Sequence, residues 1–131
     1  MTQINCAKIS KIDPDIILPD LVDRYEVELA DVKELNEIYL ELAQGEKIYS
    51  IINGKNKSSH FSNQALKYLS HEAPFIEEYD LMRGSVIVAG ALPGRIIVNI
   101  FWRLKQHIYP IKVVSTLDQA MSWIEAQRKK D

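Results

Sequence analysis

The stretch "GSVIVAGALPGRIIVNIFWRL", residues 84–104, joins the pattern of a strand directly to that of a helix. Residues 84–90 are rich in β-branched side chains and have glycine at both ends, which predicts a buried strand. Residues 93–107 are apolar nearly all round, and Pro93 suits a first helical turn because its missing N–H would have no partner there. A strand that leads into a buried helix is the repeating unit of α/β proteins.

The apolar run within this stretch also raises the question of a membrane anchor. A spanning helix needs about 20 apolar residues. The run from Ile96 to Leu104 is shorter than that, with Arg95 and Arg103 at its edges. The pattern therefore predicts a buried helix, with or without a partner, and argues against a membrane span.

Outward from this unit, strands and helices alternate along the chain. Gly45 is a natural helix stop, Ser62 is a suitable N-cap, and Thr116 with Gln119 forms a capping-box pattern. Pro19 indicates an edge or a bend in its strand, because proline donates no hydrogen bond to a ladder. Strands are predicted at 6–13, 15–22, 47–54, 84–90 and 109–115, and helices at 29–45, 62–73, 93–107 and 116–130.

This order, strand-strand-helix-strand-helix-strand-helix-strand-helix, predicts an α/β fold. Single helices between strands require crossover connections, which place the helices over a mainly parallel sheet. We therefore expect one domain over residues 1–131, with a mixed, mainly parallel sheet of about five strands and four helices. A chain of this length also allows a sizeable core.

Composition and charge argue against several classes of protein. Lys and Arg number 16 against 18 Asp and Glu, and the net charge of −2 argues against a nucleic-acid binder. The basic end "RKK" at 128–130 is interpreted as a frayed helix end. The single cysteine, Cys6, allows neither an intramolecular disulfide nor a Cys-rich zinc site. The first residues lack the pattern of a signal peptide, so a cytoplasmic location is expected.

Five segments carry a resemblance to a known group of folds: "LADVKELNE", "IYSIING", "NQALKYLS", "VAGALPGRIIVNIFWRL" and "YPIKVVSTLDQAMSWI". Their order resembles the STAS/SEC14-like fold and, more narrowly, small bacterial STAS-like proteins of unassigned function, over about residues 15–126. The resemblance implies a non-enzymatic binding or regulatory module that acts through protein contacts. Its SEC14 side implies the alternative of a binding protein for a small lipid-like or anionic molecule.

The best-known STAS proteins are antagonists of anti-sigma factors, which are switched by phosphorylation of a serine at the start of a helix. Ser58, Ser59 and Ser62 lie in the corresponding loop-to-helix region, where a helix N-terminus favours a phosphate. The antagonists carry Asp-Ser-x-Gly at that point, and this chain does not. The alternative is that Ser62 caps a helix while Ser58 and Ser59 are solvated loop residues.

Arg95 and Asn99 form a second candidate site, for an anionic ligand. They are four residues apart and share a face of the helix predicted at 93–107. The guanidinium of Arg95 and the free N–H groups of the first helical turn can bind an anion together. The structural alternative, which we favour, is that Arg95 pairs with a carboxylate and Asn99 satisfies a backbone group or a subunit contact.

The same helix predicts a contact surface. Val98 and Trp102 are four residues apart and point away from the inner stripe of the helix, with Arg103 as a further candidate contact. An apolar patch edged by polar groups often marks an interface, and a two-fold homodimer is its simplest closed form. We therefore expect a homodimer through residues 95–106, or else that helix 116–130 covers Val98 and Trp102 within one chain.

Other chemistry is sparse in the sequence. His60, His71 and His107 fall on different predicted elements with no paired spacing, so no metal site is expected. No glycine-rich phosphate loop and no ordered Ser/His/Asp set stands out. The sequence therefore predicts a protein without a cofactor and without catalytic residues.

Overall fold

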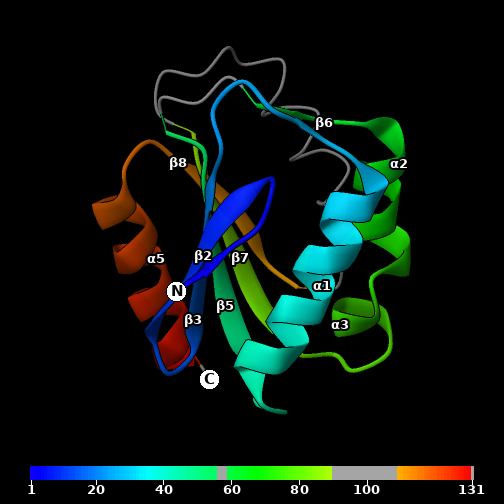
Figure 1. Cartoon of the computed structure of the whole chain (residues 1–131). Coiled ribbons are helices and arrows are strands. Elements are labelled where there is room, and N and C mark those ends of the chain that lie inside the picture. Colours follow the sequence, from blue (N-terminus) through cyan, green and yellow to red (C-terminus); the bar gives the residue numbers. More distant parts are fainter. Residues whose placement is uncertain (56–58, 90–108, 131) are drawn as a thin grey trace.

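The computed structural model describes residues 1–55, 59–89 and 109–130, which form a six-stranded sheet with helices on both faces (Figure 1). The helix predicted at 93–107 lies outside the described residues. With it, six candidate residues also lie outside them: Ser58, Arg95, Val98, Asn99, Trp102 and Arg103.

The main sheet is mixed, in the order β1-β2-β3-β5-β7-β8. The pairs β1–β2 and β2–β3 are antiparallel, and β3, β5, β7 and β8 run parallel to one another. A separate two-stranded parallel ladder joins β4 to β6. The strands are β1 (Thr2–Gln3), β2 (Ala7–Asp13), β3 (Ile16–Leu21), β4 (Glu26–Val27), β5 (Ile48–Asn53), β6 (His60–Phe61), β7 (Met82–Val88) and β8 (Ile111–Val114).

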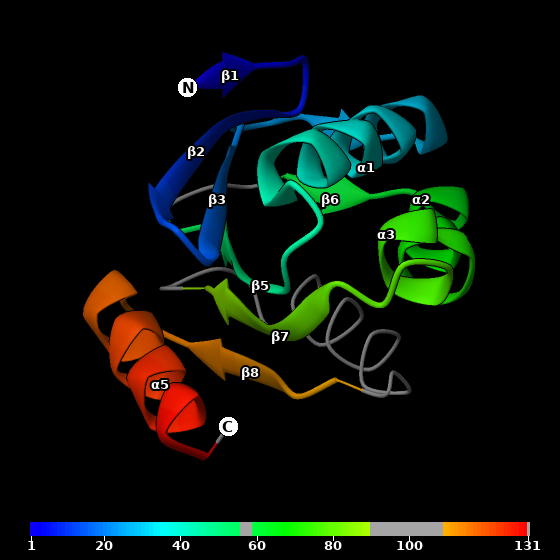
Figure 2. The ribbon, with the colours of Figure 1, turned by 90° about the horizontal axis from the view of Figure 1, so that it is seen from below.

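The described part of the chain contains four α-helices, namely α1 (Leu29–Ala43), α2 (Asn63–Lys67), α3 (Pro74–Glu77) and α5 (Leu117–Lys130). Figure 2 shows α1, α2 and α3 on one face of the sheet and α5 on the other. The predicted α/β class is therefore confirmed. The main sheet has six strands where about five were expected, because the short β1 pairs with β2.

The helix ends follow the local signals in the sequence. The chain leaves α1 through Gln44 and Gly45, both of which have positive φ. The hydroxyl of Ser62 accepts a hydrogen bond from Ala65 N at 3.1 Å, as an N-cap does. Thr116 Oγ1 accepts from Gln119 N at 3.2 Å, so the predicted capping box is confirmed.

The helix predicted at 62–73 changes its winding in its second half. After α2, the chain continues as a π-helix, η1 (Tyr68–Glu72), in which Ala73 N donates to Tyr68 O at 2.8 Å. Pro74 then begins the short helix α3. Apolar spacing predicted one continuous helix here, because it does not distinguish a hydrogen bond to the fourth residue from one to the fifth.

The edge position that Pro19 suggested for its strand is wrong. β3 lies inside the sheet, between β2 and β5. The pairing of β3 with β5 runs through Ile16–Tyr49, Ile17–Ser50 and Asp20–Asn53, and passes over Pro19. Proline is tolerated because its missing N–H falls in this interruption of the ladder.

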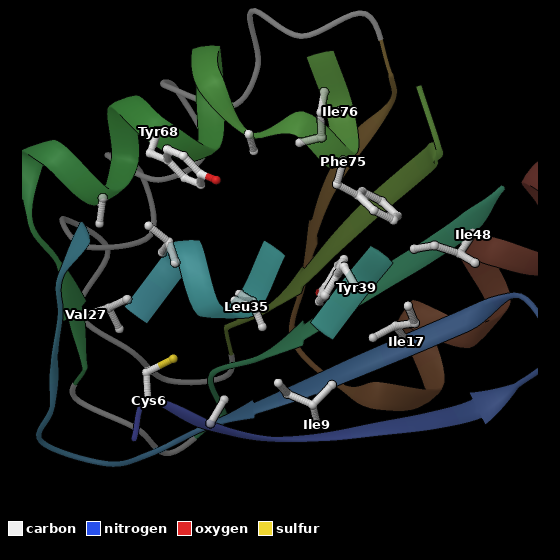
Figure 3. Close-up of a cluster of buried hydrophobic side chains, with 14 of the residues drawn as sticks. Cys6, Ile9, Ile17, Val27, Leu35, Tyr39, Ile48, Tyr68, Phe75 and Ile76 are labelled. Carbon is white, nitrogen blue, oxygen red and sulfur yellow. The ribbon is translucent and has the colours of Figure 1, made fainter. Parts of the chain in front are cut away.

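Side chains of the central strands alternate between the two faces of the sheet. In β5, Ile48 joins the buried cluster beneath α1, whereas Tyr49 and Ile51 join the cluster beneath α5. Figure 3 shows the first cluster, with Leu35 and Tyr39 of α1 among the side chains that fill it. Both faces are therefore apolar, which is why these strands lack a hydrophobic–polar alternation in the sequence.

The C-terminal basic end is more ordered than the frayed end that the sequence suggested. Arg128 Nε donates to Asp15 Oδ2 at 3.0 Å, and its Nη2 donates to Asp13 Oδ2 at 3.0 Å. A further bond joins its Nη1 to Glu125 of the same helix. Arg128 thus connects the end of α5 to the turn between β2 and β3.

Candidate ligand cavity

A cavity of about 60 Å³ lies between the sheet and the helices of the α1 face. Tyr39 and Phe75, which Figure 3 labels, both line it, and their rings meet edge to face with centroids 5.3 Å apart. The described lining comes from five strands, from α1, η1 and α3, and from Cys6, Ala73 and Tyr109 beside them. Nearly all of it is apolar, which is the usual character of a site for a small molecule.

Asn36 is the least satisfied polar side chain of the cavity wall. It projects from the inner side of α1, with 4% of its surface exposed. Its Oδ1 accepts a hydrogen bond from Phe75 N at 2.9 Å, which fixes the orientation of the amide. No atom of the described residues lies within hydrogen-bond reach of its Nδ2. A buried donor without a partner costs about 1–3 kcal/mol, so such groups are rare in native proteins.

Two serines lie side by side in the wall that the sheet contributes. Ser50 of β5 pairs in register with Ser85 of β7, and their exposed fractions are 1% and 2%. The hydroxyls of Ser50 and Tyr39 are 2.5 Å apart, so one of them donates to the other. Asn36, Tyr39, Ser50 and Ser85 thus place polar groups in a wall that is otherwise hydrophobic.

The ionisable groups of the wall are held in their neutral forms. Burial raises the pKa of the Cys6 thiol to about 12, with a smaller contribution from the nearby Asp31 carboxylate. Burial likewise raises the pKa of Tyr39 and of Tyr109. None of the described residues that line the cavity is Asp, Glu, Lys, Arg or His. At neutral pH the described wall therefore carries no charge.

The π-helix borders this cavity. Leu69 lies within η1 and lines the cavity, as does Ala73 at its C-terminal end. A π-turn inserts one extra residue into a helix and often occurs at functional sites. Ala73, in an extended conformation, then separates η1 from α3, where Phe75 N donates to Asn36 Oδ1.

The described serines among the phosphorylation candidates lie apart from this cavity lining. Ser59 is buried, and its hydroxyl donates to Val22 O. Ser62 is partly buried and caps α2. Phosphorylation of Ser59 would require this segment to open, because the hydroxyl is enclosed and already bonded. Phosphorylation of either serine stays a prediction.

Sequence reasoning missed the polar residues that mark the cavity. Asn36 falls on the same helix face as Val32, Leu35 and Tyr39, where an apolar side chain is expected. Ser50 interrupts the apolar run "IYSII". A polar residue at a predicted core position is the signal that would have found the site.

The described residues lack two other kinds of feature, a metal site and a membrane-spanning helix. These residues contain no group of three or more His, Cys, Asp or Glu side chains that is able to hold a metal ion. Within residues 1–55, 59–89 and 109–130, no helix has the length and apolar character needed to cross a membrane.

The fold and the site together define an α/β protein with a largely apolar cavity on one face of its sheet, whose described lining carries no charge. Residues 10–128 match the model of a family described as a domain of unknown function, DUF7793, and the chain belongs to that family. No curated protein and no solved structure matches the chain.

Proposed function

We propose that this protein is a binding module for a small, largely apolar molecule, held in the cavity between the sheet and the α1 face helices. The observation that carries the proposal is the Asn36 amide, which is buried and fixed at one end by Phe75 while its two Nδ2–H donors have no described partner. A bound molecule that accepts a hydrogen bond would remove the cost of leaving them unpaired.

The composition of the wall supports binding rather than a reaction. The raised pKa of Cys6 keeps its thiol protonated, and a thiol is a far weaker nucleophile than a thiolate. The buried tyrosines also stay protonated at neutral pH. We therefore propose a non-enzymatic role, in which the protein holds or senses its ligand.

A role through protein contacts, which the STAS/SEC14 resemblance implies, is the broader alternative. Its predicted contact surface at residues 95–106 and the anion site of Arg95 and Asn99 lie outside the described residues. The two roles are compatible, since a ligand-binding module often regulates a partner. The described residues support a ligand-binding role more directly than a role through protein contacts, so experiments should begin with ligand binding.

Xenon is a suitable probe, because it enters apolar cavities without needing a hydrogen bond. We expect xenon to produce saturable shifts of the backbone amide NMR signals of Asn36, Ser50 and Ser85, all of which line the cavity. The Ala73→Leu variant fills the cavity from its wall and should abolish these shifts. Ala126→Leu adds the same atoms on an exposed part of α5 and should leave them unchanged.

The outcome that contradicts the proposal is equally specific. Absence of localised shifts in the parent protein, or equal shifts in the parent and Ala73→Leu, would mean that no accessible cavity exists at this place. Native mass spectrometry of the protein purified from its own host then identifies the occupant by its mass, which should be released on denaturation and should be missing from Ala73→Leu.

A further inference from the structure

We infer that the cavity selects a small neutral molecule with a hydrogen-bond acceptor, such as a short ketone, ester or amide, whose oxygen binds Asn36 Nδ2. This inference rests on the proposed function and narrows it to a class of ligand. Three properties of the wall carry it: the direction of the Asn36 amide, the absence of charge in the described lining, and the size of the cavity.

The orientation of the Asn36 amide means that the ligand must accept a hydrogen bond. An asparagine side chain has an acceptor end and a donor end. In Asn36 the acceptor end is already bonded to Phe75 N at 2.9 Å, so the donor end is the one left for a ligand. A pure hydrocarbon would fill the space but leave both N–H groups unpaired, and so would bind more weakly.

The absence of charge in the described lining decides that the acceptor is neutral. Moving an ionised carboxylate from water into an apolar site is very costly unless a cation or several donors compensate it. The described lining holds no Lys, Arg or His, and its side chains are Asn, Ser, Tyr, Cys and apolar residues. A ketone oxygen needs only the one or two donors that Asn36 supplies.

The volume limits the part of the ligand that is enclosed. A cavity of about 60 Å³ accommodates roughly four to six water-sized groups, at about 10–15 Å³ for each. Cyclopentanone has this size and carries one carbonyl. Cyclopentane has the same ring without the acceptor, and cyclopentanecarboxylate replaces the carbonyl with a charge. These three compounds form a matched series.

The experiment is an NMR titration of the parent protein with this series at pH 7, which follows the side-chain Nδ2–H₂ signals of Asn36. Cyclopentanone should bind about tenfold more tightly than cyclopentane and shift these signals, because it pairs a buried donor. Cyclopentanecarboxylate should show no saturable binding. Equal affinity of the ketone and the hydrocarbon, or preference for the carboxylate, would overturn the inference.

A variant links the preference to Asn36. Asn36→Leu has a side chain of similar size without the amide donors, so it should lose the preference for cyclopentanone over cyclopentane. Asn63→Leu makes the same change at an exposed position of α2 and should retain the preference. If Asn36→Leu does not fold, the titration of the parent protein still decides the inference.

The two proposals fail in distinguishable ways. Xenon binding without a preference for the ketone would overturn the inference while the proposed function stands. Binding of neither xenon nor any of the three ring compounds would remove both.

Discussion

On the α5 face of the sheet, Gly84 lies so close to Trp123 that a Cβ added there would stand 3.1 Å from the indole ring, and 3.2 Å from the ring of Tyr49. On the opposite face, Asn36 keeps an unpaired donor beside a cavity of about 60 Å³. The two faces therefore differ at these places: a methyl group at Gly84 would require Trp123 and Tyr49 to shift, whereas the cavity beside Asn36 has room for several atoms.

This difference indicates that the α5 face mainly stabilises the fold, whereas the cavity face is available for function. On the α5 face, Ala120 and Ile124 are fully buried against strands of the sheet centre. On the other face, polar groups stand where apolar ones would pack better, at Asn36, Ser50 and Ser85. Natural proteins depart from ideal packing mainly at functional sites, and Asn36, Ser50 and Ser85 all line the cavity.

The largest expected effect is on the rate at which Cys6, which lines the cavity, is alkylated. Its pKa of about 12, against 9.0 for an unperturbed thiol, reduces the thiolate fraction at pH 8 about a thousandfold. We expect iodoacetamide to modify the native protein about a thousandfold more slowly than the urea-unfolded chain, as followed by mass spectrometry. Fast modification of the native protein would mean that water reaches Cys6, which would contradict the dry and uncharged character assigned to the described cavity wall.

Truncation of the α5 face should have the next largest effect. Ile124→Ala is expected to lower the free energy of unfolding by about 3–4 kcal/mol, because the dense surroundings cannot close the void. Leu117→Ala, on the exposed side of the same helix, should cost less than about 1 kcal/mol. Urea denaturation measures both. Similar losses in the two variants would show that α5 is not packed as the structure has it.

Enlargement of a side chain should separate the two faces directly. Gly84→Val is expected to cost about 2 kcal/mol, because its added atoms meet Trp123 and Tyr49. Ala73→Leu, on the cavity wall, should cost less than about 1 kcal/mol, because there is space for its added atoms. Thermal unfolding of both variants provides the test, and an equal loss would contradict the claim that one face is hollow.

The smallest effect on the free energy of unfolding is expected for substitution of Arg128, which lies outside the buried clusters beneath α1 and α5. The Arg128 hydrogen bond lowers the pKa of Asp15, so the pair stabilises the fold above the ordinary pKa of 3.8. That contribution is lost as pH falls below 3.8 and through the lower pKa of the folded state. Arg128→Met should therefore cost about 1 kcal/mol at pH 7 and progressively less toward pH 2.

The control for this change is Lys129→Met, which removes the same charge from an exposed position of α5. It should leave stability nearly unchanged at both pH values. An equal loss in Arg128→Met at pH 7 and pH 2 would indicate that the side chain acts through packing and not through its carboxylate partners.

The α/β class and most of the described elements were predictable, because their signals are local. Capping residues such as Ser62 and the Thr116–Gln119 pair bond within a few residues of themselves. Ala120 and Ile124, which are four residues apart in the helix predicted at 116–130, are both fully buried. Such features depend only on neighbouring residues, so the sequence displays them directly.

The cavity was not predictable from local signals, because its polar groups meet across the chain. Asn36 bonds to the backbone of Phe75, 39 residues away, and Ser50 meets Ser85 only through the register of β5 with β7. Arg128 and Asp15, which are 113 residues apart, are a second example. A polar residue in an apolar run is visible in the sequence, but its partner depends on the fold.

The position of α5 in the chain has a consequence for synthesis. This helix is the last described element, and it covers the sheet face formed by Ile16, Tyr49, Ile51 and Val86. While the chain is being made, that face stays exposed until residues 117–130 have left the ribosome. Exposed apolar strands of this kind aggregate readily or recruit chaperones. A chain that stalls just before α5 would therefore be a chaperone substrate, even with the cavity face already assembled.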